Sequence, residues 1–163
     1  MRIKAIKLDF EIPSHVVKAD RLNVDISNLD ESLFMRIASG RITISVDAVK
    51  EPIVLETEVL DYVLQIKEAL ECIDAGQDRS FAVDRDYYSN NVHFELNRRT
   101  KQLTIREMNG GLFKLELPYS LFCESFLDFY SRAINIFQRL YPELLKNKAF
   151  LKYSVKGRSS FSS

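Results

Sequence analysis

The stretch from Ser120 to Leu140 constrains the fold more than any other part of the chain. Apolar residues recur there at steps of three or four, a spacing that places them on one face of an α-helix. These residues are Phe122, Phe126, Phe129, Ala133, Ile136 and Leu140. A helix of this length is about 30 Å long, so its apolar face needs a sheet to pack on.

The residues before this helix alternate between apolar and polar side chains, which is typical of half-buried strands. Alternating or apolar runs occur at residues 2–12, 22–26, 33–37, 42–46, 81–83, 92–96, 103–105 and 113–117. Pro52 limits the short run 53–55 to an edge strand or a lead-in. Asn109-Gly110-Gly111 is a strong hairpin signal, because such turns favour residues that tolerate positive φ.

A second helix is predicted between the two groups of strands. We expect Thr57 to cap its first turn and Gly76 to end it. Its buried stripe is predicted to be Val59, Val63, Ile66, Leu70 and Ile73. Ser120 is the expected cap of the long helix, and Pro142 either ends that helix or starts a short last turn.

Together these elements predict an α+β fold. We expect an antiparallel sheet of about eight strands in two meanders, packed by two amphipathic helices, in the order four strands, helix, four strands, helix. Residues 1–147 form a single domain in this prediction. Residues 148–163 are basic and poor in apolar residues towards the end, and we expect a partly disordered tail there.

The composition is that of an ordinary globular domain. Hydrophobic residues make up 46% of the chain, and the 23 basic and 23 acidic residues balance. A neutral total gives no general attraction to nucleic acid or to anionic lipid, so we expect neither partner. The two cysteines, Cys72 and Cys123, are too few for a disulfide framework, and no signal peptide or membrane segment is recognisable. We therefore expect a cytoplasmic protein.

No catalytic or cofactor motif is present, and we predict neither a cofactor nor a metal. His93 and Glu95 share one strand face, but two residues fall short of a metal-binding motif, and a polar sheet face explains both. Asp84 and Asp86 form a possible carboxylate pair, although a solvated strand end explains them as well. Tyr87 and Tyr88 beside asparagines suit a protein-binding surface.

Acidic residues are concentrated around the first helix. Nine acids lie between residues 47 and 78: Asp47, Glu51, Glu56, Glu58, Asp61, Glu68, Glu71, Asp74 and Asp78. Only Lys50 and Lys67 are basic there. Solubility is the common reason for such a surface, and a docking surface for a basic partner is the functional alternative.

The order of elements resembles that of WapI-type immunity proteins of bacterial polymorphic toxin systems. The similarity lies in the strand 40–46, the helix 60–76, the strand around 94–96, the stretch 113–117 and the closing helix. This resemblance implies a non-enzymatic inhibitor that binds a cognate toxin domain and occludes its active site. The expected partner-binding residues are Glu58, Asp61, Glu68, Glu71, Tyr87 and Tyr88.

Two other functions remain open at this level. The 11 phenylalanines and seven tyrosines are enough to line an apolar pocket between the sheet and the long helix, which would make the chain a small-molecule-binding domain. The other alternative is a hydrolase-type enzyme in which Asp84, Asp86, His93 and Glu95 converge. The sequence leaves the oligomeric state and the strand order undetermined.

Overall fold

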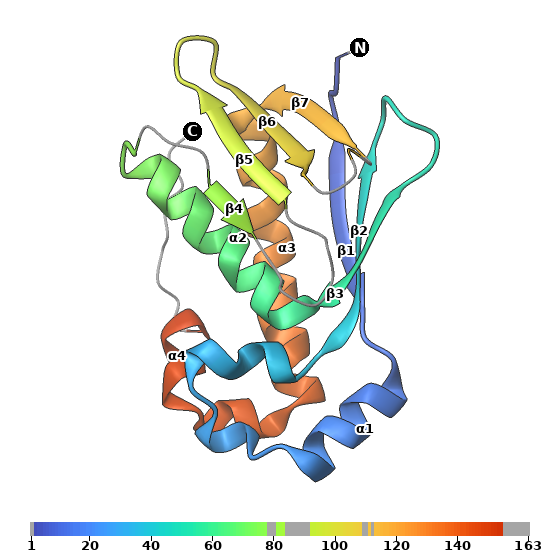
Figure 1. Cartoon of the computed structure of the whole chain (residues 1–163), viewed down its shortest axis with the longest axis vertical. Coiled ribbons are helices and arrows are strands. Elements are labelled where there is room, and N and C mark those ends of the chain that lie inside the picture. The colour runs from blue at the N-terminus through green and yellow to red at the C-terminus, as the bar shows by residue number, and fades with distance from the viewer. Residues whose placement is uncertain (1, 78–80, 84–91, 109–110, 112, 155–163) are drawn as a thin grey trace.

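The chain forms two separate antiparallel sheets in the computed structural model, instead of the single predicted sheet (Figure 1). Residues 2–77, 81–83, 92–108, 111 and 113–154 are described. Both sheets have their strands in sequence order, β1-β2-β3 and β4-β5-β6-β7. The strands are β1 (Ile6–Glu11), β2 (Ser39–Val46), β3 (Ile53–Glu58), β4 (Phe81–Val83), β5 (Val92–Asn97), β6 (Gln102–Glu107) and β7 (Lys114–Pro118). The α+β class is confirmed, and the prediction of one sheet of about eight strands is wrong.

α-Helices and 3-10 helices connect several of these strands in the sequence, and others follow the last strand. The α-helices are α1 (Ser14–Asn23), α2 (Val59–Asp74), α3 (Tyr119–Leu140) and α4 (Lys148–Ser154). The 3-10 helices are η1 (Ile26–Asn28), η2 (Glu31–Arg36) and η3 (Pro142–Lys146). Pro142 therefore starts a short last turn after α3. In Figure 1, α1, α4 and the 3-10 helices gather at one end of the molecule, and the four-stranded sheet lies at the other.

The segment between β1 and β2 differs most from the prediction. The two strands expected at residues 22–26 and 33–37 are absent from the structure, which has α1, η1 and η2 there. A 3-10 helix places residues three apart on one face, so its buried residues recur at a step of three and not at a step of two. The observed burial supports this reading, because Ile26, Leu29, Phe34 and Ile37 are all buried.

The two sheets are connected by α3. It contacts β1 of the first sheet and β6 and β7 of the second, and it also contacts α2 (Figure 1). A chain of aromatic rings runs along this helix from Phe94 on β5, through Phe122, Phe126 and Phe129 on α3, to Phe10 on β1. Neighbouring ring centroids are 5.7 to 6.1 Å apart. The core is thus continuous between the sheets although no strand is shared.

The predicted buried stripe is confirmed for α2 and only partly for α3. All five predicted residues of α2 are buried, and Gly76 has the predicted left-handed backbone, with φ at 85°. On α3, Ile136 and Leu140 are only half-buried, whereas Tyr130, Ile134 and Phe137 are buried. The long helix is covered on more than one side, so its buried face is wider than the predicted stripe.

Neither of the predicted N-terminal helix caps, Thr57 and Ser120, is present. Thr57 is the fifth residue of β3, and the residue at the N-cap of α2 is Glu58, with no side-chain cap hydrogen bond. Pro118 precedes α3, and Ser120 lies inside its first turn. The side chain of Thr57 is 3% exposed, and its Oγ1 has no hydrogen-bond partner among the described residues. A buried hydroxyl without a partner costs free energy instead of stabilising the helix start.

The first part of the predicted C-terminal tail also differs from the prediction. Residues 148–154, predicted to belong to a partly disordered tail, form α4, and Phe150 is fully buried. The remaining residues of the predicted tail, 155–163, lie outside the described part of the chain.

We predict that Thr57→Val stabilises the protein by about 1 kcal/mol, because valine keeps the shape of threonine and removes the unpartnered hydroxyl. A threonine that capped α2 would give the opposite sign, a loss of about 1 kcal/mol. Urea unfolding measures the difference. Thr43→Val is the matched control, since Thr43 is a half-exposed threonine of β2, and its free energy of unfolding should change by less than about 0.5 kcal/mol.

We also predict that Phe126→Ala destabilises the protein by about 3 to 5 kcal/mol, the usual cost of a large cavity in a core. Phe126 is fully buried and contacts the rings of Phe122, Phe129 and Tyr130. Phe113→Ala, at a half-buried position, should cost clearly less. Equal losses in the free energy of unfolding for the two variants would show that the chain of aromatic rings adds nothing beyond ordinary burial of a ring.

Candidate functional site

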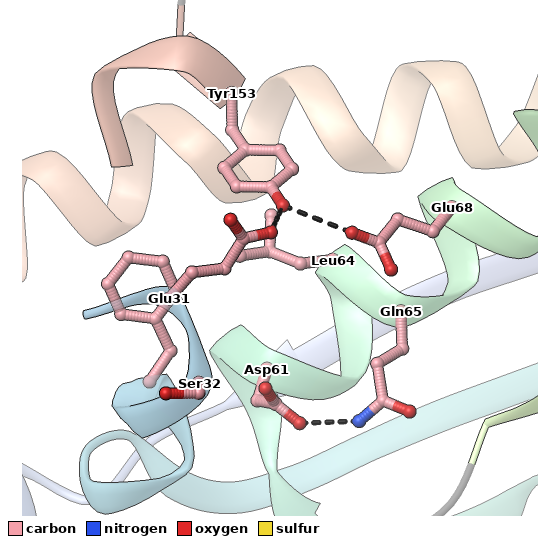
Figure 2. A pocket seen from close by; sticks show the side chains of 8 residues that line it. Glu31, Ser32, Asp61, Leu64, Gln65, Glu68 and Tyr153 are labelled. Carbon is pink, nitrogen blue, oxygen red and sulfur yellow. Dashed lines mark hydrogen bonds between the residues drawn. The ribbon is translucent and has the colours of Figure 1, made fainter. Parts of the chain in front are cut away.

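A groove of about 350 Å³ opens between η2, α2 and α4 (Figure 2). It is lined by Glu31, Ser32, Phe34, Asp61, Leu64, Gln65, Glu68 and Tyr153. The residues come from three segments far apart in the sequence. Three of the side chains are carboxylates, and together they make the groove acidic.

The α2 side of the groove follows directly from helix geometry. Asp61, Leu64, Gln65 and Glu68 are spaced by three, one and three residues, so they lie along one face of the helix. This face is distinct from the stripe that α2 buries against the core. In Figure 2 the side chains of Asp61, Gln65 and Glu68 extend from α2 towards the groove. The amide of Gln65 donates a hydrogen bond to Asp61 over 2.5 Å.

The groove has an apolar base and a polar rim. Phe34 is fully buried and Leu64 is 4% exposed, whereas Glu68 is exposed and Glu31 and Asp61 are partly exposed. An apolar base favours the alkyl part of a side chain, and a carboxylate rim favours a positive charge at its end. The groove is therefore chemically suited to a lysine or arginine side chain.

The carboxylates of Glu31 and Glu68 meet at the hydroxyl of Tyr153 (Figure 2). The Tyr153 hydroxyl bonds to Glu31 Oε1 and lies 3.2 Å from Glu68 Oε1. Lys152 forms an ion pair with the other oxygen of Glu31. Partial burial, followed by the charge of Glu31, raises the pKa of the Glu68 carboxyl above its usual value, and the charge of Glu71 adds to this. The positive charge of Lys152 opposes the rise in pKa.

Asn147 holds the α4 wall of the groove in place. Its side chain is 1% exposed, and Nδ2 donates to the carbonyls of Ile26, over 2.7 Å, and Leu29, over 2.9 Å. Its Oδ1 accepts a hydrogen bond from the backbone of Phe150, 3.0 Å away, inside the first turn of α4. One residue thus caps α4 and ties it to the η1 region.

A second, partly buried network lies at the end of η2. Asp20 Oδ2 on α1 accepts hydrogen bonds from the Tyr141 hydroxyl, over 2.6 Å, and from the backbone of Ala38, over 2.9 Å. Ala38 has a φ of 63°, a left-handed conformation that is unfavourable for alanine. Because Ala38 joins η2 to β2, this network sets the direction of the chain as it leaves the groove.

The predicted site residues are only partly brought together. Asp61 and Glu68 both line the groove. Glu71 forms an ion pair with Lys67 one turn earlier on α2 and is not among the lining residues. Glu58 is 7% exposed where β3 passes into α2, so it does not lie on the exposed surface with Glu68, and its role in partner binding stays a prediction. Tyr87 and Tyr88 lie outside the described residues.

Sequence reasoning missed Glu31, Phe34 and Tyr153. Phe34 lies in a segment predicted to be a strand, Glu31 lies just before that segment, and Tyr153 lies in the predicted tail. A signal for α4 was available, because Ala149, Phe150 and Tyr153 are spaced by one and three residues. Nothing in the local sequence indicates that this short helix packs beside α2.

The other candidates for chemistry do not form a site in the described residues. His93 is partly buried and Glu95 is exposed on β5, while Asp84 and Asp86 lie outside the described part. Within the ranges that the structure describes, no three His, Cys, Asp or Glu residues are grouped to hold a metal ion. Both cysteines are free, and burial raises the pKa of the Cys123 thiol to about 11, which keeps it neutral near pH 7.

The space predicted for an apolar pocket is occupied by side chains. Between β5 and α3, the rings of Phe94 and Phe122 are 5.7 Å apart, and Phe122 and Phe126 are stacked at 6.1 Å. All three are 2% exposed or less. A small-molecule site between the second sheet and α3 would require these rings to move.

Comparisons with family models, with curated proteins and with solved structures yielded no match to this chain. Among the helices of the described segments, none combines the length and apolar character that crossing a membrane requires. The candidate function therefore depends on the groove itself.

We predict that Asn147→Ala destabilises the protein by about 2 to 4 kcal/mol, because two buried carbonyls lose their donor and α4 loses its cap. Asn147→Asp should also destabilise it, since a carboxylate keeps the cap and cannot donate to the two carbonyls. Thermal or urea unfolding provides the measurement. Asn28→Ala is the control, because Asn28 is exposed, and its effect should stay within about 0.5 kcal/mol.

Proposed function

We propose that this chain is a non-enzymatic protein-binding module, an immunity protein that binds and neutralises a cognate bacterial toxin domain. The observation that carries the proposal is the acidic groove between η2, α2 and α4. Glu31, Asp61 and Glu68 present their carboxylates around an apolar base formed by Phe34 and Leu64. A basic segment of the partner is the occupant with matching chemistry.

The size and polarity of the groove match one long basic side chain. The alkyl stem of a lysine or arginine would pack on Leu64, and its charged end would reach the carboxylates at the rim. An arginine has the further advantage that its planar guanidinium can bind two carboxylate oxygens at once.

Electrostatics also favour a basic partner. Partial burial, followed by repulsion from the nearby carboxylate of Glu31, raises the pKa of Glu68 in the unbound chain. A positive charge from a partner would relieve the repulsion. Charge complementarity of this kind also speeds the encounter between two proteins.

The position of the basic residues on such a partner explains how binding would neutralise the toxin. Domains that cleave nucleic acids carry basic clefts around their active sites, because their substrates are polyanions. An acidic surface that occupies such a cleft would exclude the substrate without any chemistry. In this proposal the chain acts by occlusion, and its own residues perform no reaction.

The first test is to co-express the chain with the product of the neighbouring gene and to purify a complex. We expect a stable complex and loss of the partner's toxicity. If no complex forms and the neighbouring product remains toxic in the presence of this chain, the proposal is wrong.

The second test locates the binding surface. The double variant Asp61→Asn, Glu68→Gln should weaken binding about five- to thirtyfold, which corresponds to about 1 to 2 kcal/mol, and calorimetry or surface plasmon resonance would measure it. Wild-type binding should also weaken as salt is raised. The matched control is Glu124→Gln, Asp128→Asn on α3, two exposed acids that line a different cleft. Equal effects of both double variants would place the interface outside the groove.

A further inference from the structure

One hydroxyl joins two carboxylates at the C-terminal wall of the groove. Tyr153 on α4 is within hydrogen-bonding distance of Glu31 on η2 and of Glu68 on α2 (Figure 2). A tyrosine hydroxyl has a single hydrogen, so it can donate to only one of the two. The second contact is favourable only if its carboxyl carries a proton of its own.

We propose that Glu31, Tyr153 and Glu68 form a proton-dependent clasp that fastens α4 to η2 and α2. With Glu68 protonated, its carboxyl donates to the Tyr153 oxygen, and the Tyr153 hydroxyl donates to Glu31. When Glu68 loses its proton, two carboxylates compete for one hydrogen, and one of the two contacts is lost.

Glu68 is the member of the clasp that takes up the proton. Glu31 is stabilised as an anion by Lys152, which pairs with its other oxygen. Glu68 has no such ion pair within the described residues. Burial, the charge of Glu31, a side-chain hydrogen bond with Glu31 and the charge of Glu71 all raise the pKa of Glu68. Lys152 acts on Glu68 in the opposite direction.

The other charged and titratable groups around the clasp are already engaged. Lys67 on α2 pairs with Glu71 and lies over the rings of Tyr130, on α3, and Tyr153. Asp61, also on α2, accepts a hydrogen bond from Gln65. These contacts do not involve the Tyr153 hydroxyl. The number of protons in the clasp therefore depends on the protonation of Glu31 and Glu68.

The clasp matters because α4 is too short to be stable by itself. A helix of seven residues depends on tertiary contacts. Its other contacts are the Asn147 cap, the Tyr130 hydroxyl bonded to the Tyr153 carbonyl over 3.1 Å, and the packing of Phe150 on Phe34, with ring centroids 6.4 Å apart. Opening of α4 would widen the groove and uncover Phe34.

The pH dependence follows from the direction of the pKa shift. A carboxyl whose pKa is higher in the folded state than in the unfolded state stabilises the fold when it is protonated, and this stabilisation is lost as pH rises through the folded pKa. The clasp therefore holds α4 more firmly in mildly acidic solution than at neutral pH. This inference concerns the chain alone and does not depend on the proposed partner.

Hydrogen exchange of the α4 amides in the full-length chain tests the clasp. We expect the protection factors of residues 150–154 to fall roughly fivefold as the pH is raised from about 4, below the usual glutamate pKa of 4.5, to about 8, which corresponds to the loss of one hydrogen bond. The amides of Leu103 and Ile105, buried in β6, serve as an internal reference for global unfolding.

Three variants separate the clasp from general packing. Glu68→Gln imitates the protonated acid, so α4 should be as protected at pH 8 as the wild type is at about pH 4. Tyr153→Phe removes the shared hydroxyl, so α4 protection should be low and independent of pH. Glu124→Gln on α3, outside the groove, should keep the wild-type dependence. Wild-type α4 protection that is constant with pH, or a Glu68→Gln variant that keeps the wild-type dependence, would overturn the proposal.

Discussion

The aromatic contact between α3 and the two sheets is the interaction on which the rest of the structure depends. The sheets share no strand, so they are held together only through what packs between them. Phe122, Phe126 and Phe129 on α3 connect Phe94 of one sheet to Phe10 of the other. Rings in contact bury large areas and add their own edge and stacking preferences, which gives this link both strength and a defined geometry.

The groove depends on a different kind of contact, made by one buried and one half-buried polar side chain. Asn147 and Asp20 each bind several backbone or side-chain groups from segments more than 15 residues apart. Such networks are costly when incomplete, so each partner must be in place for the segment to fold. They hold α4 beside η1 and the end of η2 beside α1. The functional proposal and the inferred clasp both arise where η2, α2 and α4 meet.

Strong periodic patterns were predictable and weak ones were not. The α2 stripe, the strands at 42–46 and 92–96, and the long helix follow from side-chain periodicity, because each element buries one face in a repeating pattern. The strands predicted at 22–26 and 33–37 are wrong, because the 3-10 helices η1 and η2 have only 3 and 6 residues, too few for a three-residue repeat to show in the sequence. Within the site, Asp61 and Glu68 were predicted from the charge of α2, whereas Glu31 and Tyr153 could not be, because their roles come from contacts across 122 residues of sequence.

The sequence by itself determined the α+β class, the two long helices and the concentration of acidic residues on α2. These are local properties, set by side-chain spacing and charge within a single element. Only the tertiary structure decided that the strands divide into two sheets, that Glu58 is buried, and that Glu31, Glu68 and Tyr153 meet. The physical reason is that such contacts depend on how separate elements pack, and no local pattern of residues encodes the distance between them.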